Sequence, residues 1–172
     1  MGQGCKVTLI DRKPAQIEQS RQFDIKVYYG DGTRIDLLRR AGADQANLII
    51  FAQDDRNFSV AAIQPILEAF PQASVLVRAF DRRHLIEMTD LNLGGSVREV
   101  YESAVSMGRI ALEKLGLASD QVDEIERLYR ENDRKRLDVQ IAGGALEAAK
   151  DLMYRPGRAM ILPEKQMIGD DA

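Results

Sequence analysis

The sequence contains no tryptophan, one cysteine (Cys5) and one histidine (His84). A single cysteine allows neither an internal disulfide nor a cysteine-based zinc site, which fits a reducing compartment and leads us to expect the cytoplasm. No apolar run approaches the ~20 residues that a membrane-spanning helix needs. The longest such runs are NLIIF and SVLV, and no signal-peptide pattern opens the sequence.

The sequence also lacks an excess of positive charge. It has 24 Lys and Arg against 27 Asp and Glu, for a formal net charge of -3. Binding to nucleic acid or to anionic lipid needs a concentrated basic face, so we expect no nucleic-acid partner. With 172 residues, 45% hydrophobic and 30% charged, the chain is typical of one soluble globular domain, with or without an appendage.

Short apolar, β-branched runs recur along the first hundred residues, at 6–10, 25–29, 47–52, 74–79 and 96–100. Each of the first four is followed by a polar turn and a helix-like segment. This alternation predicts an α/β fold with a doubly wound, mostly parallel, Rossmann-like sheet.

Several residues are typical of helix ends. Pro14 suits a first helical turn. Thr33 stands three residues before Asp36, which predicts a capping box, and Gly42 is placed to end the helix that follows.

After residue 100 the pattern changes to two consecutive helices, at 102–116 and 119–137. The dense charge of the second helix favours a solvated face over a partner-facing one. We therefore expect three parts: an alternating α/β domain over 1–100, a pair of helices over 101–142, and a flexible C-terminal tail over 143–172.

In an open parallel sheet, ligands bind outside the carboxyl ends of the strands. Asp11 ends the first predicted strand, where an acidic residue can accept both ribose hydroxyls of a nucleotide; a surface Asp at a helix start is equally compatible. The neighbouring Arg12 and Lys13 leave a ribose 2′-phosphate possible.

The segment at the end of the second predicted strand has the sequence YGDGTR. Gly30 and Gly32 free the backbone to turn and let a ligand approach. The amides at the Thr33 helix start could serve an anion, and Asp31 could accept from a hydroxyl or an adenine amino group. An Asp-Gly turn without a ligand is the alternative.

Ala52, Gln53 and Arg78 lie at the ends of the third and fourth predicted strands. They are therefore expected beside the same ligand-binding edge of the sheet. Asp54 and Asp55 could hold magnesium, but helix capping explains them better, so we expect no metal.

Catalytic residues are scarce. No tyrosine has a lysine four residues later, so the Tyr/Lys pair of many nicotinamide reductases is missing. His84 is best interpreted as a surface histidine, and Cys5 as a packing residue rather than a nucleophile. The crevice is suited to bind a ligand, not to transform one.

A dinucleotide fold has a Gly-x-Gly-x-x-Gly loop after its first strand, with the acidic ribose ligand about 20 residues further on. Only ten residues precede Asp11 in the sequence, so a glycine loop at that distance is not included in it. Gly2 and Gly4 directly precede the Asp11 strand, so we interpret them as a helix-to-strand turn and expect a sheet truncated at its N-terminus.

Together, the stretch from VTLID to FAQDD and the following VLVRAFDRRHLIEMTDLNL resemble the RCK, or KTN, regulatory domain (TrkA-N-like) of potassium transport proteins. The YGDGTR-DLL-AGA pattern is the specific part. The segment GRIALEKLGL at 108–117 is similar to the crossover helix of the Kef-type, glutathione-regulated potassium/proton antiporters.

The resemblance implies a domain that dimerises through its last helices, binds an adenine nucleotide (AMP or NAD(H)) and regulates a transmembrane antiporter domain at the cytoplasmic face of the inner membrane, with an ancillary subunit as a further partner. It implies a nucleotide site lined by Asp11, Arg12, Gly30, Asp31, Gly32, Thr33, Ala52, Gln53 and Arg78. Phe23 matches an aromatic position near the glutathione site of this family. Without the glycine loop, we expect weak nucleotide binding.

Two other functions stay open. One is a fragment of an NAD(P)-dependent oxidoreductase, which the scarcity of catalytic residues disfavours. The other is a free-standing Trk-type regulator of potassium uptake, which the Kef-like 108–117 segment disfavours.

Overall fold

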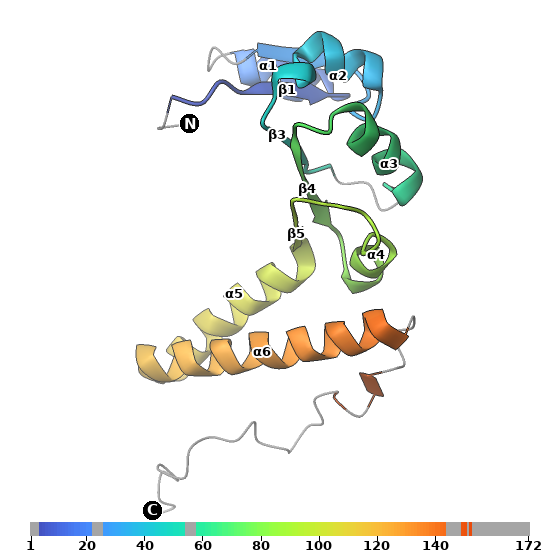
Figure 1. Cartoon of the computed structure of the whole chain (residues 1–172). Helices are drawn as coiled ribbons and strands as arrows, with labels where there is room; N and C mark the ends of the chain where they lie inside the picture. The colour runs from blue at the N-terminus through green and yellow to red at the C-terminus, as the bar shows by residue number, and fades with distance from the viewer. Residues whose placement is uncertain (1–3, 22–25, 54–57, 144–148, 151, 153–172) are drawn as a thin grey trace, which may run out of the picture. The chain divides into compact units, whose positions relative to one another are not determined.

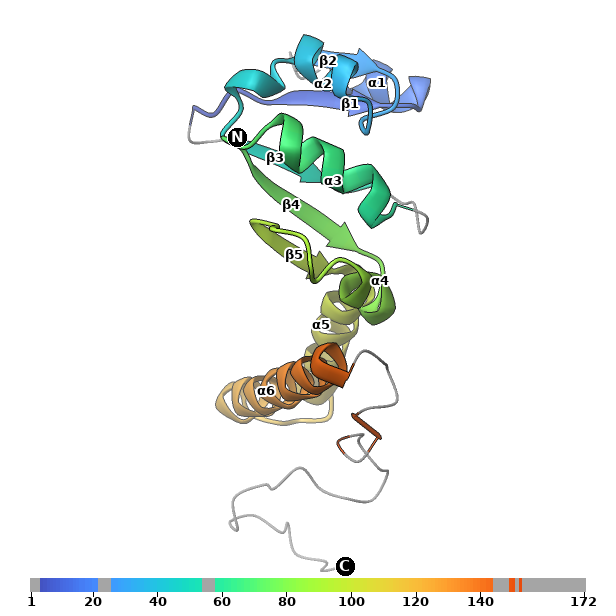
Figure 2. The ribbon, with the colours of Figure 1, turned by 45° about the vertical axis from the view of Figure 1, so that its right-hand side comes forward.

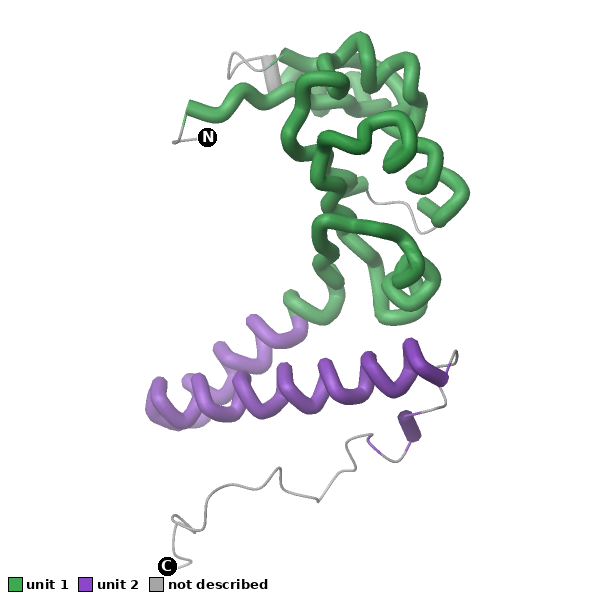
Figure 3. The backbone as a smooth tube through the Cα atoms, in the orientation of Figure 1, with its two compact units in different colours: residues 1–103 green, residues 104–172 purple. Residues whose placement is uncertain are grey.

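The structure is a computed structural model that describes residues 4–21, 26–53, 58–143, 149–150 and 152 (Figure 1). The chain forms two compact units, residues 1–103 and 104–172 (Figure 3). Each unit is described below by itself.

The first unit alternates strands and helices as the sequence predicts. Its elements are β1 (Thr8–Asp11), α1 (Pro14–Arg21), β2 (Lys26–Tyr29), α2 (Ile35–Ala41), the short 3-10 helix η1 (Ala43–Gln45), β3 (Leu48–Phe51), α3 (Val60–Ala69), β4 (Ser74–Ala79), α4 (Arg82–Glu87) and β5 (Gly95–Arg98). The helix α5 (Glu99–Lys114) starts in this unit and continues into the second, which also contains α6 (Ser119–Gly143).

All strand pairings are parallel, which confirms the predicted α/β fold. The strands form two ladders, however: β1 pairs with β2, and β3, β4 and β5 follow one another in a second ladder. Figure 2 shows β1 lying between β2 and β3, with the strands pointing the same way. The predicted sheet is thus interrupted between β1 and β3 within the described part of the chain.

One hydrophobic core joins these elements. Every second residue of β3 and β4 is buried, as expected for strands covered on one face. These side chains pack with α3, whose Ile63 and Ile66 are fully buried, and with Phe70 and Met88. Each such side chain contributes roughly 1.5–3 kcal/mol of burial free energy. Ile10 of β1 packs against the same core, so both ladders belong to one folding unit.

Of the three helix-end predictions made for Pro14, Gly42 and Thr33, the first two are confirmed and the third is wrong. Pro14 is the first residue of α1, and Gly42 ends α2 in the left-handed conformation with φ 100°. The capping box predicted for Thr33 is wrong, because Arg34 is the N-cap residue of α2 and has no side-chain cap hydrogen bond. The Thr33 side chain instead bonds to Asp31.

In the second unit, the two predicted helices are confirmed, with α6 extending six residues beyond the predicted end at 137. Gly116, with φ 92°, reverses the chain between α5 and α6. Arg109 of α5 pairs with Asp123 of α6 at 2.6 Å and with Glu126 at 3.1 Å. In the described residues, we find no helix long and apolar enough to cross a membrane.

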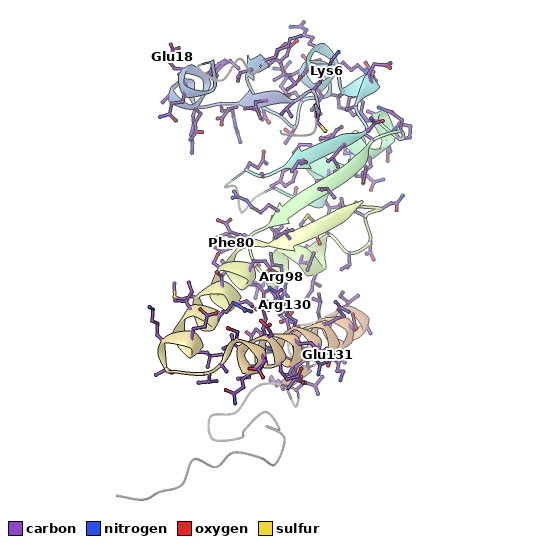
Figure 4. All side chains as sticks on the ribbon, turned by 90° about the vertical axis from the view of Figure 1, so that its left-hand side faces the viewer. Lys6, Glu18, Phe80, Arg98, Arg130 and Glu131 are labelled. Carbon is purple, nitrogen blue, oxygen red and sulfur yellow. The ribbon has the colours of Figure 1, made fainter. Side chains whose placement is uncertain are left out.

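The strand predicted at 96–100 is shorter than expected. β5 ends at Arg98, and Glu99 and Val100 form the first turn of α5. Acidic side chains at Glu99 and Glu102 favour this early start, because they interact well with the positive end of the helix dipole. Arg98 lies at the junction (Figure 4), with its guanidinium carbon 3.9 Å from the centre of the Tyr101 ring.

Candidate functional site

The first part of the candidate site is the turn that follows β1. The Lys13 backbone N–H donates to Asp11 Oδ1 at 2.7 Å, which shapes the entry into α1. The Asp11 carbonyl accepts from Gly30 N–H at 3.0 Å, so the ends of β1 and β2 are joined through their backbones. Asp11 therefore has the helix-start role that the sequence allows, at the position where a ribose ligand is expected.

The second part is the turn after β2. Asp31 Oδ1 accepts from the Thr33 backbone N–H at 2.9 Å and from Thr33 Oγ1 at 2.8 Å. These two hydrogen bonds, with a smaller contribution from the nearby Arg12 and Arg34, lower the pKa of Asp31 below its usual value. The Asp31 carboxylate is therefore a fixed negative charge at the carboxyl end of β2.

Gly30 makes this turn possible. Its φ of 148° lies in a region that side-chain-bearing residues rarely adopt, and a Cβ placed there would stand 2.6 Å from Leu37 Cδ2. Gly32 is different, because its nearest neighbour would be Ile10 Cγ2 at 3.9 Å, an ordinary contact. Of the two glycines, only Gly30 is required by the geometry of the described residues.

A charge pair connects the two turns. Arg12 Nη1 lies 3.8 Å from Asp31 Oδ2. Both side chains are partly exposed, so the pair is open to solvent and to a ligand. Acceptors from Asp31 and a guanidinium from Arg12 can together engage a polar ligand that carries both hydroxyls and an anionic group.

The remaining predicted residues lie on the other ladder. Ala52, which is exposed, and Gln53, which is half-buried, follow the end of β3. Arg78 lies near the end of β4, and its Nε is 3.5 Å from Glu99 Oε2. The contacts above connect five of the predicted site residues, namely Asp11, Arg12, Gly30, Asp31 and Thr33. For Ala52, Gln53 and Arg78, a role in ligand binding stays a prediction. Phe23, Asp54 and Asp55 lie outside the described residues.

Sequence reasoning missed the role of the single histidine. His84 is buried, so its interpretation as a surface residue is wrong. Its Nδ1 accepts from Phe80 N–H at 3.2 Å, which places the ring proton on Nε2, and Nε2–H donates to the Phe58 carbonyl. His84 thereby ties the exit of β4 to the segment that enters α3. Asp81 Oδ1 accepts from His84 N–H at 2.9 Å, so Asp81 is the N-cap of α4.

Cys5 precedes β1 and is exposed. The packing role predicted from the sequence is therefore wrong for this residue.

The parallel α/β topology, with acidic and glycine residues at the carboxyl ends of β1 and β2, defines a doubly wound domain of the nucleotide-binding type. The chain belongs to the TrkA-N domain family, whose match extends over residues 1–95. The resemblance seen in the sequence is confirmed.

Among curated proteins, the chain is 34% identical over 149 residues to "Glutathione-regulated potassium-efflux system protein KefC" of Klebsiella pneumoniae. This match covers 87% of the chain and 24% of the relative, so the chain spans about a quarter of that protein's length.

Among solved structures, the chain is similar to "Shewanella denitrificans Kef CTD in AMP bound form", with 33% identity and a TM-score of 0.72. This likeness covers 82% of the chain and 85% of that structure. The TrkA-N domain of the inner membrane protein ybaL from Escherichia coli matches with 13% identity and a TM-score of 0.57, over 63% of the chain and 81% of that domain. The second likeness shows the fold alone.

Proposed function

We propose that this chain is the regulatory ligand-binding domain of a Kef-type potassium efflux system and that it binds an adenine nucleotide. The observation that carries the proposal is the meeting of Asp11, Arg12 and Asp31 at adjoining strand ends, in a chain 33% identical to a Kef domain solved with AMP. In this assignment the Asp11 and Asp31 carboxylates accept hydroxyl or amino donors of the nucleotide. Arg12 faces the negative charge of the nucleotide.

The domain's role is to bind and to signal rather than to catalyse. The curated relatives are potassium-efflux proteins, which favours a regulatory domain over an oxidoreductase fragment. The proposal includes a transmembrane antiporter domain as the partner, at the cytoplasmic face of the inner membrane. Glutathione is a second candidate ligand because the relatives are named as glutathione-regulated.

A backbone-amide NMR titration tests the nucleotide assignment. AMP, NADH and glutathione are added separately to the whole chain, and we expect AMP to shift the amide signals of residues 8–13 and 29–34, with weak affinity. Asp11→Ala and Asp31→Ala should each raise the dissociation constant of AMP by roughly tenfold, the usual effect of losing one charge-assisted hydrogen bond.

Asp90→Ala is the matched control, because Asp90 is an exposed carboxylate in the turn after α4. Its affinity for AMP should equal that of the parent. Signals that shift only elsewhere in the chain, or an affinity unchanged in both Asp11→Ala and Asp31→Ala, would show that the site is misplaced.

We further propose that the domain is a homodimer through α5. Met107 and Ile110 of this helix are 72% and 54% exposed, and Leu115, the residue after its end, is 77% exposed, an apolar surface that water disfavours in a lone subunit. A second copy of the chain is the occupant that the proposal commits to. Light scattering should give a dimer mass for the parent and a monomer mass for Met107→Lys with Ile110→Lys; a monomeric parent would contradict it.

A further inference from the structure

The single histidine of the sequence is a buried titratable group that the candidate site does not use. Both ring nitrogens of His84 contact the backbone. Nδ1 accepts from the Phe80 N–H at 3.2 Å, and Nε2–H donates to the Phe58 carbonyl. Only the neutral ring with its hydrogen on Nε2 satisfies both contacts.

Protonation of the His84 ring would break one of these contacts and keep the other. An imidazolium carries a hydrogen on each nitrogen. The added hydrogen on Nδ1 would face the Phe80 N–H, so two donors would meet with no acceptor between them. Nε2–H would still donate to the Phe58 carbonyl, and with the greater strength of a charged donor. The contact at Phe80 therefore depends on the charge of the ring, whereas the contact at Phe58 does not.

Phe80 connects the end of β4 with the start of α5. It follows Ala79, the last residue of β4, and its carbonyl accepts from the Val100 N–H at 3.5 Å (Figure 4). Val100 lies in the first turn of α5, where N–H groups have no partner within the helix. Because the N–H and the carbonyl of Phe80 flank one Cα atom, a displacement that frees the N–H also moves the acceptor of Val100. The change thereby reaches α5, which continues into the second unit.

Phe58 is the fixed end of this arrangement. It is buried, and the centre of its ring lies 5.0 Å from that of Phe51, the last residue of β3. Both aromatic side chains belong to the hydrophobic core of the first unit. An imidazole held at Phe58 can lose its contact with Phe80 without leaving that core.

The charged residues of α4 include one that favours a charged ring. Asp81, the N-cap, attracts an imidazolium through its carboxylate, while its Oδ1 accepts from the His84 backbone N–H at 2.9 Å. The half-buried Arg82 repels it. Arg83 and Glu87 of the same helix are exposed, so their charges are screened by solvent.

The neighbouring strands contribute two arginines. Arg98 of β5 is in register with Ala79 of β4 and shares its core-facing side, with its guanidinium over the Tyr101 ring. Arg78 alternates with Ala79 and points to the other face of β4, where it pairs with Glu99 of α5. Arginine has donors only, so neither residue can accept a hydrogen bond from a protonated Nδ1. On α3, Glu68 is exposed and bonds to Gln64.

We propose that His84 is a proton-operated switch between β4 and α5. The neutral ring holds Phe80 in the position that serves Val100, and protonation of Nδ1 releases Phe80 while Nε2–H stays on the Phe58 carbonyl. The released state binds the proton more tightly, so a fall in pH shifts the population toward it. Imidazole is the side chain that ordinarily changes charge between about pH 5 and 8, so the signal is acidification below about pH 6.5. This inference concerns the fold and does not depend on nucleotide binding.

An NMR titration of the whole chain from about pH 8 to about pH 5.5, without nucleotide, tests the switch. The imidazole nitrogen signals should show Nδ1 without a hydrogen at the alkaline end and protonated at the acid end. The amide signals of Phe80 and Val100 should follow the same titration curve, whereas that of Val75, in the buried part of β4, should not. Hydrogen exchange of the Phe80 amide, corrected for the intrinsic effect of pH, should accelerate by up to about tenfold per pH unit, the limit for uptake of one proton.

His84→Asn and His84→Gln are the variants that cannot titrate, and each keeps a different contact. An asparagine oxygen lies near the place of Nδ1 and can accept from Phe80, and a glutamine amide reaches the place of Nε2 and can donate to Phe58. In each variant that folds, the Phe80 and Val100 signals should stay constant over this pH range. The ring nitrogen signals of the parent decide the question without any variant.

Arg83→His in the His84→Gln background is the matched control, because position 83 is exposed on the same helix. Its imidazole should titrate while the Phe80 and Val100 signals stay constant. Three results would each overturn the proposal: a hydrogen on Nδ1 of His84 at the alkaline end, Phe80 and Val100 signals that do not change in the parent, or changes that persist in His84→Gln. Loss of the Val75 signal at the same pH would also overturn it, because the chain would then unfold as a whole rather than release Phe80.

Discussion

Arg12 Nη1 lies 3.8 Å from Asp31 Oδ2, and this pair connects the turn after β1 with the turn after β2. The two residues are far apart in sequence and meet because β1 and β2 are parallel neighbours whose carboxyl ends share one edge. The contact gives the candidate site a cation and an anion side by side. Four further predictions follow from contacts of this kind.

The first concerns the pH dependence of Asp31. Hydrogen bonds from Thr33 hold its pKa below the ordinary value of 3.8, so the folded state favours the ionised carboxylate. Stability from a lowered pKa is fully present above the unfolded value and is lost as pH falls through the folded value. Asp31→Asn should therefore be less stable than the parent at pH 7, and the difference should shrink below about pH 4. Urea unfolding at pH 7 and pH 3 measures this, with Asp90→Asn as the control; a difference constant with pH would contradict it.

The second concerns the two glycines of the β2 turn. Gly30→Ala should lower the free energy of unfolding by about 1–3 kcal/mol, because alanine is strained at φ 148° and its Cβ would approach Leu37. Gly32→Ala, where the nearest atom is 3.9 Å away, should change it by less than about 0.5 kcal/mol. Chemical denaturation of both variants tests the contrast. Equal effects would show that the turn does not need glycine at position 30.

The third concerns His84. Replacing it by Ala removes the partners of Phe80 N–H and of the Phe58 carbonyl. Each unsatisfied buried group costs about 1–3 kcal/mol, so the variant should be clearly destabilised. Arg83→Ala, at an exposed neighbouring position, is the control and should stay near the parent value. Unfolding curves that coincide for the two variants would rule out the bridging role of His84.

The fourth concerns the connection between α5 and α6. Arg109 reaches Asp123 and Glu126 across the two helices, whereas Arg127 pairs with Glu124 and Glu131 within α6 alone. Arg109→Ala should therefore lower the melting temperature more than Arg127→Ala does. The difference should diminish in 1 M NaCl, where the Debye length falls to about 3 Å. A larger effect of Arg127→Ala at low salt would contradict the cross-helix role.

Local patterns in the sequence were sufficient for much of the fold. The alternation of β-branched runs with helix-like segments predicts the parallel α/β order, and Pro14, Gly42 and Gly116 stand at helix ends as expected. These features depend on backbone preferences of single residues and on side-chain periodicity, which neighbouring residues determine. The strand-end position of Asp11 and Asp31 was predictable for the same reason.

Local patterns failed where a side chain had a choice of partners. Thr33 was expected to cap α2, but Asp31 competes for its hydroxyl and backbone N–H. His84 and Cys5 were misassigned because burial depends on which distant segments pack nearby. Phe58 precedes α3, and only the packed core brings it against His84.

By itself, then, the sequence determined the class of fold, the start of α1 at Pro14, the end of α2 at Gly42 and the residues that follow the strands, since each depends on short-range backbone preference and periodicity. Only the tertiary structure decided that Arg12 meets Asp31 and that His84 bridges the segments at Phe58 and Phe80. Those relationships depend on strand order and packing, which bring residues together across long stretches of chain that no local pattern encodes.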